Sequence, residues 1–250
     1  MPSVNAEALR ADDPVVLPHL GRIGQLWSAV ADVADHRTRG WTLIGALMVM
    51  LHEHEAGTPT RPATVDADAV VDARGATGAT AAMATLLQTQ GWELDTEHLD
   101  VDGHGYKFVR DGLEFDVIAP EGMGARADLT TVPPLRAPQL AGTRQALDRT
   151  ERVAVNLDGR ISVLPRPDLL GALVVKAAAA AADHVRGPHR HLEDLARLYS
   201  LVTDPAALTP TAKDRKRLRD TAEPAWEVLD DPANRAAGQA TRRLLAMPPT

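Results

Sequence analysis

The spacing of apolar residues predicts alternating strands and helices over the first part of the chain. Apolar side chains recur every three or four positions over residues 20–34, which is the period of a helix with one buried face. Residues 41–44 form a short apolar run that ends at Gly45, and residues 65–72 alternate between polar and apolar, as half-buried strands do. Further expectations are helices over residues 47–57 and 77–90, and a loose arm over residues 1–18.

Two Asp-Gly pairs mark predicted β-hairpins. Asp111-Gly112 separates alternating runs at residues 106–110 and 113–118, and Asp158-Gly159 separates runs at residues 153–157 and 160–164. Asp-Gly between two such runs is the strongest short-range hairpin signal, because both positions of the tight turn adopt positive φ. The first 165 residues are therefore expected to be mixed α/β.

After Pro165 the pattern becomes helical. Apolar residues keep helical spacing over residues 167–185, 191–202, 211–219, 226–230 and 235–247. We therefore expect an α/β (α+β) fold, in which a small mixed sheet flanked by helices is followed by a helical region. The predicted domains are residues 1–165, and residues 166–250 as a helical domain packed on them.

The composition excludes several kinds of site. The chain has no cysteine, so it has no disulfide framework, thiolate nucleophile or Cys-ligated metal centre. Its N-terminus shows neither the basic nor the apolar region of a signal peptide, and its longest apolar stretch, near residues 169–182, is too short to span a bilayer. We expect a cytoplasmic protein with no membrane partner.

The strand predicted at residues 65–72 places two carboxylates on one face. Side chains two apart on a strand point the same way, so Asp66 and Asp68 project together, with Cβ atoms roughly 6–7 Å apart. Such a pair can share a Mg²⁺ or Mn²⁺ ion with nucleotide phosphates, and its charges repel each other without a cation. The alternative is that Asp66, Asp68 and Asp72 line the solvated side of an edge strand.

Two further features belong with this acidic pair. On the alternating strand at residues 113–118, Glu114 and Asp116 share one face, which makes Asp116 a candidate third carboxylate and a base towards an acceptor hydroxyl. Gly45 can form a strand-to-helix turn whose backbone N–H groups receive phosphate. A single glycine can also be a turn former and nothing more.

Several segments together resemble the nucleotidyltransferase superfamily. They are Ile44-Gly45-Ala46-Leu47 at the opening of a helix, Thr64-Val65-Asp66-Ala67-Asp68, and Phe115-Asp116-Val117-Ile118-Ala119-Pro120. A narrower resemblance is to the AbiEii-type toxin nucleotidyltransferases of bacteria, carried by residues 164–176 and by His189-Arg190-His191-Leu192-Glu193-Asp194. The resemblance covers residues 40–202, and the abundance of Ala, Arg and Asp with little Lys is typical of actinobacterial members.

The resemblance implies a nucleotidyltransferase fold with Mg²⁺ or Mn²⁺ as cofactor and a nucleoside triphosphate (NTP) as donor. It implies metal on Asp66, Asp68 and Asp116, a triphosphate contact from Lys176, and an orienting role for Asp194. The other positions that it assigns to the nucleotide are Gly45, Ala46, Arg61 and Thr64. By the same resemblance, the acceptor is a tRNA 3′ end, and the chain is the toxin of a toxin–antitoxin pair with a cognate antitoxin as partner.

Two positions depart from the family pattern. Ala46 stands where the family has Gly or Ser, so a Ser hydroxyl to the phosphate is missing. The family Arg two residues before the Thr is replaced by Pro62, and Arg61 lies one residue further back. These departures leave open a catalytically decayed nucleotidyltransferase fold that binds a nucleotide, RNA or a protein. Transfer of the nucleotidyl group to protein side chains is a third alternative.

Two further motifs have ordinary alternatives. Residues 213–219, Lys-Asp-Arg-Lys-Arg-Leu-Arg, can grip an RNA backbone or form a solvated helix face. His52 and His54 lack the spacing that puts two imidazoles on one helical face, so we expect surface or hydrogen-bonded histidines there.

Overall fold

The computed structural model describes residues 9–58, 64–97, 99, 102–183 and 187–228, and in these ranges it confirms a mixed α/β fold. The strands are β1 (Leu9–Val16), β2 (Trp41–Ile44), β3 (Asp66–Val71), β4 (Glu93–Leu94), β5 (Lys107–Arg110), β6 (Leu113–Pro120), β7 (Gln139–Leu140), β8 (Thr150–Leu157) and β9 (Arg160–Pro167). The helices are α1 (Gly21–His36), α2 (Gly45–Glu55), α3 (Ala79–Thr89), α4 (Thr143–Asp148), α5 (Leu169–Ala182), α6 (His189–Ser200) and α7 (Ala212–Val228). None of these helices combines the length and the hydrophobicity that a bilayer crossing requires.

The larger sheet is mixed and has the strand order β2-β3-β6-β5-β4, with β7 paired to the end of β6. Strands β3 and β6 are parallel, whereas β2–β3, β6–β5 and β5–β4 are antiparallel. Between β5 and β6 the chain turns at Asp111 and Gly112, whose φ angles are 53° and 74°. This is the two-residue hairpin that the Asp-Gly pair predicts, because such turns need positive φ at both positions.

A smaller sheet has the order β1-β8-β9. Its β8–β9 hairpin turns at Asp158-Gly159 as predicted, with φ angles of 53° and 88°. The prediction of a loose arm over residues 1–18 is wrong for residues 9–16, because β1 pairs in parallel with β8. Pairing between β1 and β8 shifts register between Arg10 and Val15, so the segment lacks the regular alternation by which a strand is recognised.

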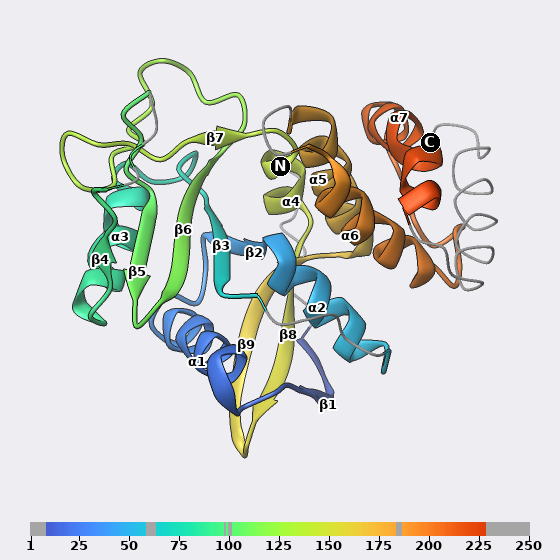
Figure 1. Ribbon diagram of the computed structural model, residues 1–250, viewed down its shortest axis with the longest axis horizontal. Helices are drawn as coiled ribbons and strands as arrows, with labels where there is room; N and C mark the ends of the chain where they lie inside the picture. The colour runs from blue at the N-terminus through green and yellow to red at the C-terminus, as the bar shows by residue number, and fades with distance from the viewer. Residues whose placement is uncertain (1–8, 59–63, 98, 100–101, 184–186, 229–250) are drawn as a thin grey trace.

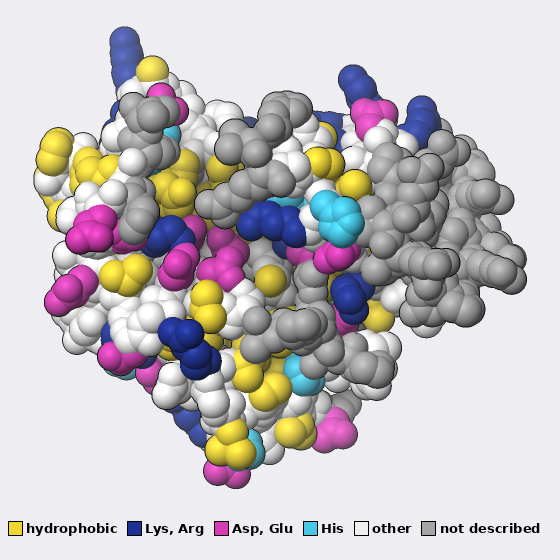
Figure 2. Space-filling model, viewed as in Figure 1, with side chains coloured by type: hydrophobic (Ala, Val, Ile, Leu, Met, Phe, Trp, Pro, Cys, Tyr) yellow, Lys and Arg dark blue, Asp and Glu magenta, His cyan; other side chains and the backbone are white. Residues whose placement is uncertain are grey.

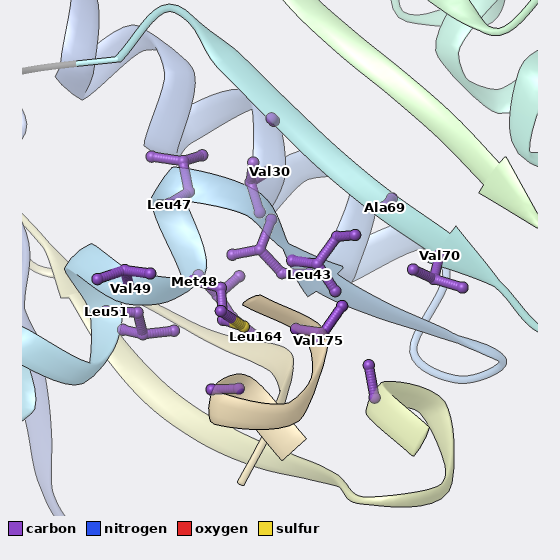
Figure 3. Packing of buried hydrophobic residues seen from close by; sticks show 14 of the residues in the cluster. Val30, Leu43, Leu47, Met48, Val49, Leu51, Ala69, Val70, Leu164 and Val175 are labelled. Atoms are coloured by element: carbon purple, nitrogen blue, oxygen red, sulfur yellow. The ribbon is translucent and has the colours of Figure 1, made fainter. Parts of the chain in front are cut away.

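One core joins the two sheets to the helices. Figure 3 shows Leu43 of β2, Met48 of α2, Leu164 of β9 and Val175 of α5 close together among other buried apolar side chains. In Figure 1 the larger sheet lies on one side of the molecule, α5, α6 and α7 lie on the other, and the smaller sheet lies below them. Because Ala, Leu and Val fill most of the core, the helices pack closely against the sheets.

The C-terminal part is helical, as predicted, but its helices have different limits. The segment expected at residues 211–219 and residues 226–228 of the next one belong to a single helix, α7, and residues 229–230 and 235–247 lie outside the described ranges. Helix α5 begins where the carboxylate of Asp168 accepts a hydrogen bond of 2.7 Å from the backbone N–H of Gly171, which caps the helix. The division between residues 165 and 166 falls inside β9 and stays a prediction.

Candidate active site

Acidic residues from two neighbouring strands lie side by side in the larger sheet. The parallel register pairs Asp68 of β3 with Asp116 of β6, and Asp66 with Glu114. Paired residues on adjacent strands project to the same face, about 5 Å apart. The four acids are partly buried, whereas Ala67, Phe115 and Val117 on the opposite face are fully buried. The alternation in the sequence therefore predicts this face correctly.

Gly45 brings the start of α2 against the carboxylate of Asp68. Ile44, the last residue of β2, is the strand partner of Asp68, and Gly45 follows with φ of +73°. A Cβ atom on Gly45 would lie 1.8 Å from Asp68 Oδ2, so any side chain here would displace the carboxylate or the turn. Glycine is required at this position by the positive φ and by the close approach together.

Thr64 fixes the first acid of the pair. Its hydroxyl donates a hydrogen bond to Asp66 Oδ1, and the backbone N–H of Asp66 lies 3.3 Å from the same hydroxyl oxygen. The structure thus places Thr64 beside the acids, although its contact is with a carboxylate. Ala46 lies in the first turn of α2, and Arg61 lies outside the described residues.

Lys107 is a site residue that the sequence reasoning missed. Lys107 is the first residue of β5 and the strand partner of Asp116. Its ammonium pairs with Glu114 and lies 3.3 Å from Asp116 Oδ1. A usable signal exists in the sequence, because a two-residue turn at positions 111 and 112 fixes the hairpin register and sets position 107 opposite 116. Figure 2 shows one face of the molecule, with acidic side chains near its middle and basic side chains beside them.

Burial and mutual repulsion perturb the carboxylates. Burial raises the pKa of Asp68 to about 6, the charge on Asp66 adds to the rise, and Lys176, Lys107 and Arg190 oppose it. Burial likewise raises the pKa of Asp116 to about 7, assisted by Asp68 and opposed by Lys107. Carboxylic acids with such raised pKa values are partly protonated near neutral pH. A bound cation would favour their ionised forms.

Lys176 and Asp194 form a buried ion pair between two helices. Lys176 Nζ on α5 donates to Asp194 Oδ2 on α6 over 2.7 Å, and both side chains are about 95% buried (6% and 5% exposed). The positive charge of Lys176 acts on the Asp68 carboxylate, so it lies within electrostatic reach of the acidic pair. The structure therefore brings together the strand acids, the lysine and its partner Asp194, which the resemblance assigns to one site.

Two basic residues at the start of α6 border the same site. The guanidinium of Arg190 is half-exposed, acts on Asp68 and lies 3.6 Å from Asp183 Oδ2. His191 Nε2 lies 3.3 Å from the same oxygen, and burial, followed by the charges of Lys176 and Arg190, lowers the pKa of His191 to about 4. His191 is therefore neutral at pH 7, and Arg190 supplies the accessible positive charge.

The donor set fits a divalent cation in part. Asp68 and Asp116 supply hard oxygen ligands, and Asp116 Oδ1 is a buried atom with no well-directed hydrogen bond. However, no three His, Asp or Glu side chains in the described ranges are grouped as a complete metal site. Asp66 is turned to Thr64, while Glu114 and Asp116 face Lys107. The predicted three-carboxylate metal site stays a prediction, with Asp68 and Asp116 as its best-placed ligands.

Residues of the other two motifs make contacts within the fold. His52 is buried and hydrogen-bonds the carbonyl of Pro167 over 3.2 Å. In the basic run, Arg217 pairs with Glu121 at 2.9 Å, and Arg215 is buried. The described residues also line a cavity of about 350 Å³ between residues 102–104 and 124–139, and none of the predicted site residues lines it.

Comparisons with known proteins are informative at the level of fold. No family model matches the chain, and no curated protein does. The chain is similar to the crystal structure of an antigenic nucleotidyltransferase-like protein from Paracoccidioides brasiliensis, with a TM-score of 0.51 and 18% identity over 88% of this chain and 93% of that one. The fold is nucleotidyltransferase-like.

A second similar structure is the antibiotic-resistance factor ANT(2'')-Ia, with a TM-score of 0.44 and 15% identity over 80% of this chain and 91% of that one. Neither structure is described as an AbiEii-type toxin, so the narrower resemblance stays a prediction. In the nucleotidyltransferase-like fold of this chain, the acids of β3 and β6, the Gly45 turn and Lys176 of α5 share one region of the molecule.

Proposed function

We propose that the chain is a metal-dependent nucleotidyltransferase, which moves a nucleotidyl group from an NTP to an acceptor hydroxyl. The observation that carries the proposal is the pairing of Asp68 with Asp116 on adjacent parallel strands, against the Gly45 turn. Their pKa values are raised by burial and by neighbouring carboxylates, so a cation would stabilise the ionised pair. The nucleotidyltransferase-like fold supports the same class of reaction.

Asp66, Asp68 and Asp116 are the residues that would hold Mg²⁺ or Mn²⁺. The chemistry supplied by such an ion, when bound, is polarisation of the α-phosphate and neutralisation of charge on the leaving pyrophosphate. Asp116 accepts the proton of the acceptor hydroxyl while the hydroxyl oxygen attacks the α-phosphorus. An ionised carboxylate at this position is a suitable proton acceptor for the attacking hydroxyl.

The other predicted residues bind the nucleotide. Lys176 places a positive charge near the acids and serves the triphosphate, and Asp194 orients it. The first turn of α2, with Gly45 and Ala46, offers backbone N–H groups at the positive end of the helix dipole. Thr64 holds Asp66, and we assign Arg61 to the nucleotide on the family resemblance alone.

The acceptor in this proposal is an RNA hydroxyl, with a tRNA 3′ end as the specific candidate and a cognate antitoxin as partner. These two assignments rest on the resemblance to AbiEii-type toxins. In the basic run of α7, Arg215 is buried and Arg217 is paired with Glu121, whereas Lys213, Lys216 and Arg219 are exposed. Arg190 is the more accessible cation near the acids and is the better candidate for contact with an RNA phosphate.

The test is transfer of label from α-labelled NTPs in the presence of Mg²⁺ or Mn²⁺ and total RNA. We expect label in RNA, and a loss of more than about 100-fold in the Asp66→Asn, Asp68→Asn double variant. Asp72→Asn is the matched control, because Asp72 follows the same strand but is paired with Arg74 at 2.8 Å. Label on protein instead of RNA would identify protein side chains as the acceptor.

A decayed, nucleotide-binding fold is the alternative that a specific observation favours. Lys107 already lies against the third carboxylate, and Ala46 lacks the hydroxyl of the family's serine. In that case the chain binds an NTP, an RNA or a protein without transferring label under any metal condition. Equal labelling by the wild type and the double variant, or none by either, would remove the catalytic proposal.

A further inference from the structure

Lys107 lies between the two acids of β6 that face the candidate site. Its side chain is 23% exposed, and its ammonium contacts Glu114 and, at 3.3 Å, Asp116. The ammonium of Lys107 is therefore a cation placed among the acids of β6.

The position of this cation explains why three carboxylates do not converge. Glu114 and Asp116 face the ammonium, whereas Asp68 lies against the Gly45 turn of the neighbouring strand. In a site with two divalent ions, the ions lie about 3.5–4 Å apart and share carboxylate ligands. An ammonium 3.3 Å from Asp116 Oδ1 takes those ligands and repels a second divalent ion at that distance.

We propose that the ammonium of Lys107 replaces a second divalent cation on the β6 side of the site, so that Lys107 excludes one ion that the acids would otherwise bind. The inference rests on the proposed function, because it takes the acids of β3 and β6 as metal ligands. Lys107 is in this view a positioning residue. It holds Asp116 and Glu114 in place by charge and limits the acids of β3 and β6 to one divalent ion.

The measurement that tests the proposal is the number of Mn²⁺ ions bound per full-length chain, from the electron paramagnetic resonance signal of free Mn²⁺. We expect Lys107→Met to bind one more Mn²⁺ than the wild type, because methionine keeps the length of the side chain and removes its charge. Lys107→Arg should bind the same number as the wild type. The control is Lys213→Met, which removes a positive charge from a lysine that is 61% exposed and pairs with Glu121, and it should gain no ion.

The gained ion should depend on the acid of β6. The Lys107→Met, Asp116→Asn double variant should bind one Mn²⁺ ion fewer than Lys107→Met alone. Thermal melting in EDTA and in Mn²⁺ provides a second readout, since Mn²⁺ should raise the melting temperature of Lys107→Met more than that of the wild type. If Lys107→Met does not fold without metal, Lys107→Gln serves in its place.

Two failures can be told apart. An equal count in Lys107→Met and the wild type, or the same gain in Lys213→Met, overturns the role of Lys107 whatever the wild-type count. A wild type that binds no Mn²⁺ overturns the metal part of the proposed function, while a gain of one ion in Lys107→Met would still assign Lys107 as the resident cation.

Discussion

Gly45 is the residue on which the geometry of the acidic pair depends. Gly45 connects β2 to α2 and has a positive φ. Because it has no side chain, Asp68 Oδ2 can occupy the position where a Cβ atom would lie. A substitution here should therefore cost backbone strain and also displace a carboxylate.

We expect Gly45→Ala to destabilise the protein more than Gly21→Ala. Gly21 is a close match, because it begins α1 with φ of +67° and has no atom within 4 Å of an added Cβ. Gly21→Ala should lower the free energy of unfolding by about 1–2 kcal/mol from strain alone. Gly45→Ala should lower it by at least ~1 kcal/mol more and weaken Mn²⁺ binding, as measured by urea unfolding and metal titration. Equal losses would show that Asp68 moves aside without cost.

The acids make the metal-free protein less stable as pH rises. The pKa values of Asp68 and Asp116 are raised from 3.8 to about 6 and about 7, so their contribution to stability is fully present below about pH 4 and is lost as pH rises through 6–7. At pH 8 without metal, Asp116→Asn should therefore melt about 2–4 °C above the wild type, for a gain of about 1 kcal/mol.

At about pH 3 this difference should nearly vanish, because Asp116 is then largely protonated in both the folded and the unfolded chain. Asp220→Asn, at an exposed position of α7, is the control and should change little at either pH. A melting temperature of Asp116→Asn at or below the wild-type value at pH 8 would mean that the contact with Lys107 outweighs burial.

At the residue scale, the sequence predicts the acids well and their partners poorly. The alternation around Asp66, Asp68 and Asp116 is a period of two, which a strand converts directly into a shared face. Lys107 was missed although the Asp111-Gly112 turn fixes the register that sets it opposite Asp116. Arg190 could not be found in this way, because its position relative to Asp68 depends on how α6 packs.

At the element scale, the buried ion pair of Lys176 and Asp194 joins α5 to α6. A buried charge left without its partner is costly, whereas removing both charges leaves neither of them unpaired. The pair is thus a link between helices whatever its role towards a nucleotide.

We expect Lys176→Met to lower the free energy of unfolding by roughly 3–5 kcal/mol, and Asp194→Leu to do the same. The double variant should lose less than the sum, and less than either single variant if its side chains pack well. Chemical unfolding of the four proteins forms a double-mutant cycle. Additive losses would contradict a direct energetic link between the two side chains.

The elements that the sequence predicts are those with a regular period or a strong turn. Both Asp-Gly hairpins and helix α1 are confirmed, whereas β1 was missed because its pairing with β8 is irregular. Two predicted helices are one helix, α7, which continues through Pro224. Tertiary packing overrides a local break in such cases, and a local pattern cannot report it.

At the scale of the molecule, α7 is tied to the α/β part by a buried acid. Asp214 pairs with Arg149, which follows α4, at 3.0 Å. The same carboxylate accepts a hydrogen bond of 2.9 Å from the backbone N–H of Thr211, and Thr211 Oγ1 accepts one of 3.2 Å from the N–H of Asp214. This reciprocal arrangement caps α7 and anchors it at once.

Asp214→Asn should therefore destabilise the whole chain. The expected loss is about 2–4 kcal/mol, from a helix cap and a buried ion pair together. Because α5 shares its core with β2 and β9, we expect one unfolding transition that shifts as a unit in calorimetry and in circular dichroism. Two separate transitions, with only one of them shifted, would instead support independent domains at residues 1–165 and 166–250.

The parallel pairing of β3 with β6 also bears on how the chain reaches its native state. The two strands are separated by a long crossover that contains α3, β4 and β5, so their pairing is non-local and costs loop-closure entropy. Each approach of these strands during folding also brings like charges together. Refolding should accordingly be faster in mild acid or with divalent ions in the buffer. The acids of the candidate active site would then slow the folding of the chain.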